Sequence, residues 1–99
     1  MLNLHLNKMD NKITVRYEGR VQGVGFRYTA AGFASRLKLG GFVRNEFDGS
    51  VTLSAEGDEN SLMDLLSEIR ASRLGKYITA EQISRSPATG EFGKNFAVM

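Results

Sequence analysis

The sequence has no cysteine, no tryptophan, a single proline and a single histidine. Without cysteine the chain forms no disulfide, no thiolate nucleophile and no cysteine-ligated zinc or iron–sulfur site. It contains no run of about 18 apolar residues, so it predicts no membrane-spanning helix. The N-terminal residues also lack the apolar core of a signal peptide. Together these absences predict a soluble protein of the cytoplasm.

The length of 99 residues predicts one domain, because two independent cores would each be too small. We therefore expect a single domain over residues 1–99, in which residues 1–11 form a loose N-terminal tail. Lys and Arg number 13 against 11 Asp and Glu, a net charge of +2. The basic residues are spread along the chain, which argues against a nucleic-acid partner and favours a small anion.

Hydrophobic periodicity predicts where the strands and helices lie. Alternation at Ile13, Val15 and Tyr17 predicts a half-buried strand. Apolar residues at helical spacing predict one helix over residues 28–39 and another after the capping residues 58–61. The remaining strands are expected at residues 42–45, 51–56, 78–85 and 94–98, with a tight turn at 48–49 between the first two. Gly40 and Gly41 are expected to stop the first helix with a left-handed conformation. Ala80 and Ile83 share a strand face only if a bulge intervenes.

The order strand, helix, strand, strand, helix, strand, with a terminal strand added, predicts the fold class. It is typical of the split βαβ arrangement, an α+β fold of two layers with both helices on one face of a single sheet. In that topology the first two strands run in the same direction and the third lies between them. Their carboxyl ends therefore meet at one edge of the sheet.

Few side chains are available for general acid–base or metal chemistry. The only histidine, His5, lies in the predicted tail, which leaves no credible histidine base. The tightest acidic cluster is Glu56, Asp58 and Glu59. A metal site is one interpretation of this cluster, but acids that interact with the dipole at a helix start are the favoured one.

The most informative polar stretch runs from Gln22 to Arg27. Glycines at positions 23 and 25 permit left-handed torsions, so the backbone can curl there. A curled backbone that leads into a helix points several N–H groups into one concavity, which suits a tetrahedral anion. Arg27 stands at the helix entry, where its planar guanidinium can hold two phosphate oxygens. The alternative is an ordinary glycine turn with a solvated arginine, and a lone Gly-x-Gly favours it.

Asn45 ends the second predicted strand, at the sheet edge where the glycine loop is also expected. An asparagine amide can hold a water molecule, because it both donates and accepts hydrogen bonds. The alternative is that Asn45 serves the turn toward Asp48 and Gly49, and the spacing alone favours that interpretation.

Three motifs taken together resemble a known family. The run Gly-Arg-Val-Gln-Gly-Val-Gly-Phe-Arg-Tyr at residues 19–28 resembles the signature of acylphosphatase. Residues 41–45, followed by 48–51, resemble its second motif, and residues 55–57 resemble its third. The resemblance covers about residues 12–98, and the combination is far more specific than any one motif. It implies a ferredoxin-like α/β sandwich with an added C-terminal edge strand and a mixed, mostly antiparallel sheet.

The resemblance also implies an activity and a set of site residues. The activity is hydrolysis of the carboxyl–phosphate bond of acyl phosphates, without a metal or a cofactor, by a monomer that binds the acyl phosphate and inorganic phosphate. By motif position, Arg27 resembles the family's phosphate-binding catalytic arginine and Asn45 its water-positioning asparagine. The backbone of residues 22–26, here called the cradle loop, resembles its phosphate cradle; the loop comprises Gln22, Gly23, Val24, Gly25 and Phe26. Residues 71–76 depart from the family pattern, because they lack its common Gly-Pro stretch.

Two other classes of function are compatible with the predicted fold. Acylphosphatase-like domains also occur within carbamoyl-transferring maturation proteins, so a module that binds carbamoyl phosphate is one alternative. The other is RNA binding on the open face of a ferredoxin-like sheet. That function needs paired aromatic residues in the pattern of an RNA-binding motif, and residues 23–27 do not supply them.

Overall fold

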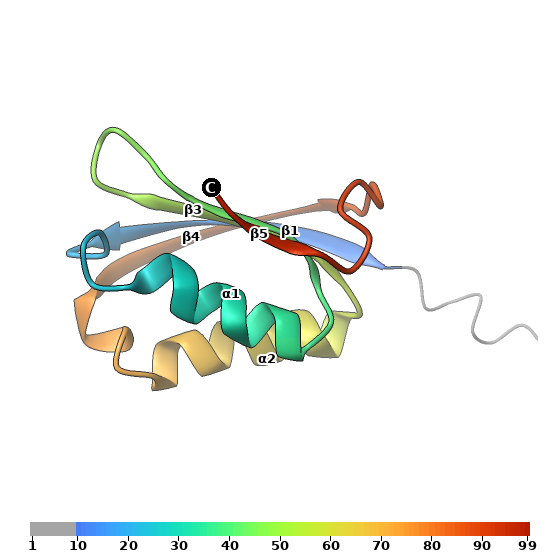
Figure 1. Cartoon of the computed structure of the whole chain (residues 1–99), viewed down its shortest axis with the longest axis horizontal. Coiled ribbons are helices and arrows are strands. Elements are labelled where there is room, and N and C mark those ends of the chain that lie inside the picture. Colours follow the sequence, from blue (N-terminus) through green and yellow to red (C-terminus); the bar gives the residue numbers. More distant parts are fainter. Residues whose placement is uncertain (1–9) are drawn as a thin grey trace, which may run out of the picture.

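The structure, a computed structural model, describes residues 10–99 and has two helices on one face of a five-stranded sheet (Figure 1). Along the chain the elements are β1 (Asn11–Gly19), α1 (Phe26–Arg36), β2 (Gly40–Asn45), β3 (Val51–Gly57), α2 (Glu59–Ala71), a short 3-10 helix η2 (Gly75–Tyr77), β4 (Ile78–Pro87) and β5 (Phe96–Val98). The predicted fold class is confirmed. Of the predicted tail, residues 1–9 lie outside the described residues, and residue 11 already belongs to β1. Within residues 10–99, no helix is long and apolar enough to cross a bilayer.

The sheet has the strand order β4-β1-β3-β2-β5. The pairs β1–β3, β1–β4 and β2–β3 are antiparallel, and β5 adds to β2 in parallel at the edge. β1 and β2 therefore run in the same direction on either side of β3. Tyr17 of β1 and Asn45 of β2 both pair with Val51, the first residue of β3. The carboxyl ends of β1 and β2 thus lie at the same end of the sheet, as the sequence predicts.

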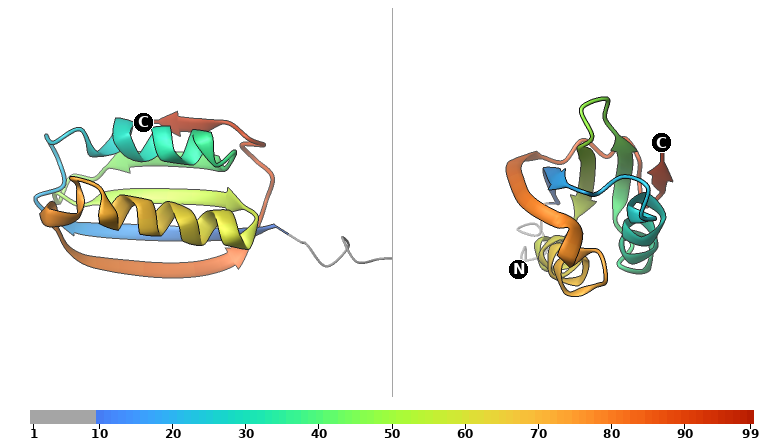
Figure 2. Two further views of the ribbon diagram at one scale, coloured as in Figure 1. Left: turned by 90° about the horizontal axis from the view of Figure 1, so that it is seen from below. Right: turned by 90° about the vertical axis from the view of Figure 1, so that its left-hand side faces the viewer.

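The core lies between the helices and the sheet face that they cover (Figure 2). The alternation predicted for β1 is confirmed, since Ile13, Val15 and Tyr17 are fully buried. Each such side chain stabilises the fold by about 1.5–3 kcal/mol relative to exposure, which is why the period-two pattern determines the register. The other buried apolar side chains of this layer include Val43, Val51, Leu53, Ala55, Ala30, Ala34, Leu62, Leu65, Leu66 and Ile69.

Helix α1 differs from its predicted range of 28–39 at both ends. It begins at Phe26 and ends at Arg36. The N–H groups of Lys38 and Leu39 donate back to carbonyls in the last turn of the helix, with N···O distances of 3.0 Å. Lys38 adopts a left-handed φ of 60°, the conformation that such a helix ending requires.

The prediction that Gly40 and Gly41 stop α1 is wrong, because both glycines already lie in β2. Lys38 takes the left-handed position instead. Gly41 has a φ of 145°, and a Cβ atom there would collide with the Ser54 carbonyl oxygen of β3. The glycine is therefore required by close approach of two strands rather than by the end of a helix.

Strand β4 contains one irregularity, at a different place from the one the sequence suggests. Ile83 lies opposite the buried Val15, whereas Ala80 faces the other side of the sheet. The register is continuous between them, so the two residues do not share a face. The extra residue falls at Thr79, beside the end of β1 at Gly19.

The acidic cluster at residues 56–59 divides among separate structural partners. The Asp58 carboxylate caps α2 by accepting from the Ser61 N–H at 3.3 Å, as its position before the helix predicts. Glu59 pairs with Arg85 of β4 at 2.8 Å. Within residues 10–99, no three His, Cys, Asp or Glu side chains gather as a set of metal ligands. The structure therefore supports the helix-start interpretation for Asp58 and Glu59, whereas Glu56 belongs to β3.

Glu56 holds the segment that leads to β5, on the sheet face away from the helices (Figure 1). The residue is only 7% exposed. Its carboxylate accepts from the Thr89 N–H at 3.0 Å, the Thr89 hydroxyl at 2.8 Å and the Gly90 N–H at 2.8 Å. Burial raises the pKa of Glu56, but these hydrogen bonds lower it by more, so the pKa lies below the usual range of a glutamate. The ionised carboxylate thus anchors residues 89 and 90, near the start of the segment 88–95.

We expect Glu56→Gln to lower the free energy of unfolding at pH 7 by about 1–3 kcal/mol, because a neutral amide cannot accept the same set of bonds. Since folding lowers the pKa of Glu56, its contribution is present above the ordinary glutamate pKa near 4.5 and is lost as the pH falls below it. Urea unfolding of both proteins across pH 3–7 measures the two effects.

The control is Glu91→Gln, which removes an exposed carboxylate from the same segment. It should leave the free energy of unfolding within about 0.5 kcal/mol of the wild type. Equal stabilities of Glu56→Gln and the wild type at pH 7, with the same acid dependence, would contradict the anchoring role.

Candidate functional site

The cradle loop curls at two glycines, as the sequence predicts. Gly23 and Gly25 have left-handed φ values of 77° and 78°, which residues with a side chain rarely adopt. Gly25 is the N-cap of α1, and its carbonyl accepts the first helical bond from the Thr29 N–H at 3.1 Å. The loop therefore passes directly into the N-terminus of a helix.

The backbone N–H groups of residues 23–28 have no hydrogen-bond acceptor among the described residues. The first N–H groups of any helix lack intrahelical partners, and here the curled loop adds further ones. No side chain caps α1. Backbone donors without partners are stable only where water or a ligand supplies an acceptor. This row of amide donors, together with the positive end of the helix dipole, favours an anion.

A cavity of about 70 Å³ opens at these donors. Its lining residues are Val21, Gly23, Gly25, Phe26, Arg27, Tyr28 and Asn45. The cavity has room for a few water-sized groups, well below the roughly 300–1,000 Å³ of sites that enclose a drug-sized ligand. It fits a small polar group such as a phosphoryl group, and any larger remainder of a ligand must lie outside it.

Most of the predicted site residues line this one cavity. Arg27 and Asn45 come together there from α1 and β2, as the topology predicts. Of the predicted cradle residues, Gln22 and Val24 are not among the lining residues. The Phe26 ring is buried against Tyr17, with ring centroids 4.9 Å apart, so Phe26 contributes through its backbone.

Arg27 is oriented by a contact that the sequence does not predict. Its Nη1 donates to the backbone oxygen of Met99 at 2.8 Å. Met99 lies just after β5, and its own N–H donates to the Val43 carbonyl of β2 at 2.9 Å. An arginine has five N–H donors, so this single bond leaves others available to a ligand. The parallel edge strand β5 thus helps to aim the guanidinium.

The turn after Asn45 is held without the Asn45 side chain. Asp48 accepts from the Ser50 N–H at 3.0 Å and the Ser50 hydroxyl at 2.6 Å, and it pairs with Arg16 at 2.7 Å. The Ser50 bonds, followed by Arg16, hold the pKa of Asp48 below its usual range. Within residues 10–99, no hydrogen bond of this turn involves the Asn45 amide. The turn interpretation of Asn45 is therefore not supported.

Gln22 joins the cradle loop to the same turn through its side chain. Its Nε2 donates to the Glu46 carbonyl at 2.7 Å and to the Ser50 carbonyl at 2.9 Å. The sequence points to the Gln22 backbone but gives no signal for this contact across 24 and 28 residues. The side chain fixes the distance between the cradle loop and the end of β2 that carries Asn45.

The lining of the cavity contains no carboxylic acid or histidine that could act as a general acid. No carboxylate lines the cavity. Among nearby acids, Glu46 has a lowered pKa because Thr52 and then Arg44 donate hydrogen bonds to it. Asp48 is likewise held ionised. The site therefore offers donors and positive charge, but no proton donor of the carboxylic type.

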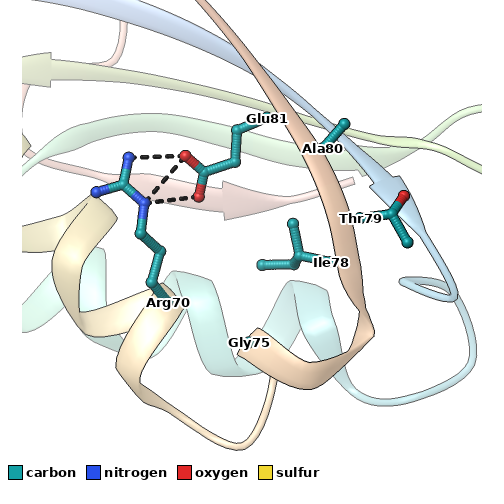
Figure 3. Close-up of a pocket in the computed structure, with 6 residues that line it drawn as sticks. All are labelled: Arg70, Gly75, Ile78, Thr79, Ala80 and Glu81. Atoms are coloured by element: carbon teal, nitrogen blue, oxygen red, sulfur yellow. Dashed lines mark hydrogen bonds and ion pairs between the residues drawn. The ribbon is translucent and has the colours of Figure 1, made fainter.

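A larger pocket, of about 400 Å³, lies between α2 and β4 (Figure 3). Arg70 of α2 and Glu81 of β4 face each other across it, with N···O distances of 2.7–3.0 Å. Glu81 neutralises the only cation in the lining, so the pocket does not attract an anion in the way the cradle loop does. Size alone does not identify the functional site.

Comparison with known proteins supports one family. Residues 13–98 match the family model described as acylphosphatase. A protein of Paenarthrobacter aurescens named acylphosphatase is 43% identical over 81 residues, which cover 82% of this chain and 86% of that protein. The crystal structure of acylphosphatase from Bacillus subtilis superposes with a TM-score of 0.82 at 31% identity, covering 90% of this chain and 98% of that one.

A domain of a much larger protein has a similar fold. The full-length HypF structure in its phosphate- and nucleotide-bound form gives a TM-score of 0.78 at 22% identity. The match covers 91% of this chain but only 12% of that one. At this identity the likeness concerns the fold alone.

The contact between Gln22 and the 46–50 turn leads to a prediction on stability. Gln22→Ala removes two hydrogen bonds, so we expect the free energy of unfolding to fall by about 1–2 kcal/mol. The amide of Gly49, which donates to Glu46 within this turn, should exchange its hydrogen faster than in the wild type. Urea unfolding and hydrogen exchange measured by NMR test both expectations.

Asn60→Ala is the matched control, because it removes an exposed carboxamide from α2, in the layer of helices rather than beside the turn. It should change stability by no more than about 0.5 kcal/mol and leave Gly49 exchange unaltered. If the two variants behave alike, Gln22 does not hold the turn.

Proposed function

The chain belongs to the acylphosphatase family, and from that premise we propose that the cavity between the cradle loop and Asn45 is where it hydrolyses acyl phosphates. The reaction breaks the bond between phosphorus and the bridging oxygen, and releases a carboxylate and inorganic phosphate. The observation that carries the proposal is the row of unpartnered amides at residues 23–28, which opens on a cavity that Arg27 and Asn45 also line.

The phosphoryl group binds at the cradle loop in this proposal. The amides of residues 23–28 donate to its oxygens, and the guanidinium of Arg27 holds two of them at once. Charge on these oxygens changes as the bond to the leaving group breaks, so donors fixed in advance stabilise the transition state. The acyl part of the substrate extends out of the cavity, where it makes few specific contacts with the protein.

Asn45 holds the attacking water. Its amide accepts a hydrogen bond from the water and can donate one to it or to the phosphate, which fixes the water in line with the leaving oxygen. Because β2 and the cradle loop are joined through the Gln22 side chain, the water and the phosphorus atom are held at a set separation. The proton that the water loses passes to a phosphate oxygen.

The chemistry of the leaving group explains why the site needs no general acid. A carboxylate leaves as the conjugate base of an acid with a pKa of about 4, so it departs without being protonated. The absence of a carboxyl group from the lining is consistent with this requirement. Positioning and charge stabilisation are then the whole contribution of the protein.

We expect the protein to hydrolyse a small aromatic acyl phosphate with a chelator present, because the proposed site uses only amides, a guanidinium and a carboxamide. Inorganic phosphate should inhibit competitively and should shift the amide resonances of residues 23–26. A turnover assay with and without chelator, followed by an NMR titration with phosphate, provides the test. Phosphate binding without any turnover would favour the binding-module alternative, and turnover only with added metal would contradict the mechanism.

Replacing Arg27 and Asn45 separates binding from water positioning. Arg27→Ala should weaken phosphate binding and abolish turnover, and Arg27→Lys should recover little because an ammonium lacks the planar fork. Asn45→Ala should lower kcat by a few hundredfold, about 3–4 kcal/mol, while phosphate affinity stays close to that of the wild type. Single-turnover kinetics and phosphate titration of each variant measure the split.

Thermal melts are the control for this pair, since both variants should remain folded if their roles lie in the site. Near-normal turnover of Asn45→Ala, or a loss that merely follows unfolding, would rule out its role with the water.

A further inference from the structure

The turn that follows α2 contacts the cradle loop through Arg73. Its Nη1 donates to the Val24 carbonyl at 2.8 Å, and its Nη2 donates to the Thr29 hydroxyl at 3.1 Å. A Cβ atom at Gly25 would lie only 2.9 Å from the same Nη2. One guanidinium therefore contacts the cradle loop just before the left-handed Gly25 and the first turn of α1 just after it.

The bond to Val24 determines where the neighbouring amide points. The Val24 carbonyl and the Gly25 N–H belong to the same trans peptide group, so they point in opposite directions. Holding that carbonyl toward Arg73 directs the Gly25 N–H away from it. A charged donor on the carbonyl also polarises the peptide group, which makes its N–H a stronger donor.

The backbone that carries Arg73 is itself well anchored. The Ser72 hydroxyl donates to the Ile69 carbonyl at 2.7 Å and accepts from the Leu74 N–H at 3.1 Å. The Leu74 side chain is fully buried in the core. The exposed Arg73 side chain thus extends from a fixed point, in the segment 71–76 where the sequence departs from the family pattern.

The charge of Arg73 is not neutralised within residues 10–99. The other bonded arginines outside the site pair with carboxylates, such as Arg70 with Glu81 and Arg85 with Glu59. No ion pair joins Arg73 to an acid there. Its partners are a carbonyl and a hydroxyl, so its positive charge remains beside a loop whose amides await an anion.

We propose that Arg73 is a positioning residue for phosphate binding, which holds the peptide group between Val24 and Gly25 so that its N–H faces the phosphoryl group. The inference rests on the proposed function of the cradle loop and deepens it. Because Arg73 orients a donor rather than the attacking water, it acts on substrate and transition state alike. Its loss then affects KM and phosphate affinity more than kcat.

Three variants test this role. In Arg73→Met we expect phosphate affinity to fall and KM to rise by about tenfold, the low end for a lost bond from a charged donor, with kcat within about threefold. The Gly25 amide resonance should move in the phosphate-free protein, and its shift on phosphate addition should shrink. Arg73→Lys should recover only part of each effect, because a point charge cannot contact Val24 and Thr29 together.

Arg36→Met is the control, since it removes an exposed arginine that pairs with Glu68 at the far end of α1. It should leave phosphate affinity, KM and the Gly25 resonance at wild-type values. Arg73→Met with wild-type phosphate affinity and an unmoved Gly25 resonance would overturn the proposal, as would full recovery by lysine.

Failure of the proposed function is distinguishable from failure of this inference. The first appears in the wild type, as absence of phosphate binding at residues 23–26 or of turnover. The second appears only in the comparison of Arg73→Met with the wild type and Arg36→Met. The Gly25 amide resonance of the phosphate-free protein reports whether Arg73 orients the peptide group between Val24 and Gly25, and this measurement does not depend on activity.

Discussion

Backbone N–H groups without an acceptor destabilise a folded chain unless water or a ligand reaches them, and the cradle loop presents a row of such groups. The surrounding contacts fix the backbone of the loop without accepting hydrogen bonds from these N–H groups. The Gln22 side chain reaches the turn after β2, and Arg73 reaches the carbonyl side of the loop. Both contacts use groups other than the free amides. The donors therefore remain available, in a fixed direction, to an anion from solution.

Topology explains how residues far apart in the sequence share this edge of the sheet. Tyr17, near the end of β1, and Asn45, at the end of β2, both pair with Val51, because β3 runs between the two strands in the opposite direction. Two parallel strands require a crossover, and α1 supplies it, beginning where the cradle loop ends. The helix N-terminus and Asn45 are consequently neighbours in any chain that folds this way. The fold brings these two groups together, and the side chains at this end of the sheet determine the chemistry.

Features with a local pattern could be predicted from the sequence, and features that depend on distant contacts could not. The alternation in β1 and the cap of α2 depend on residues that are close together in the sequence, and the structure confirms both. The prediction for Gly41 is wrong because a glycine at a helix stop and one at a close strand contact have the same sequence pattern. Gln22 and Arg73 act through side chains on carbonyls 24 to 49 residues away, and no periodicity marks such contacts. The roles expected of Arg27 and Asn45 came from motif resemblance, whereas spacing alone favoured ordinary turn residues.

The bond between Arg27 and Met99 has a consequence for synthesis of the protein. A ribosome delivers residue 27 long before residue 99, so during elongation the guanidinium is present without the oxygen that orients it. β5, which brings Met99 into place, emerges after both helices and the other strands, and it pairs with a strand made more than fifty residues earlier. The two helices and the inner strands can pack while the site is still incomplete. A nascent chain arrested at that stage would contain the folded core, but its Arg27 would lack the Met99 oxygen that orients it.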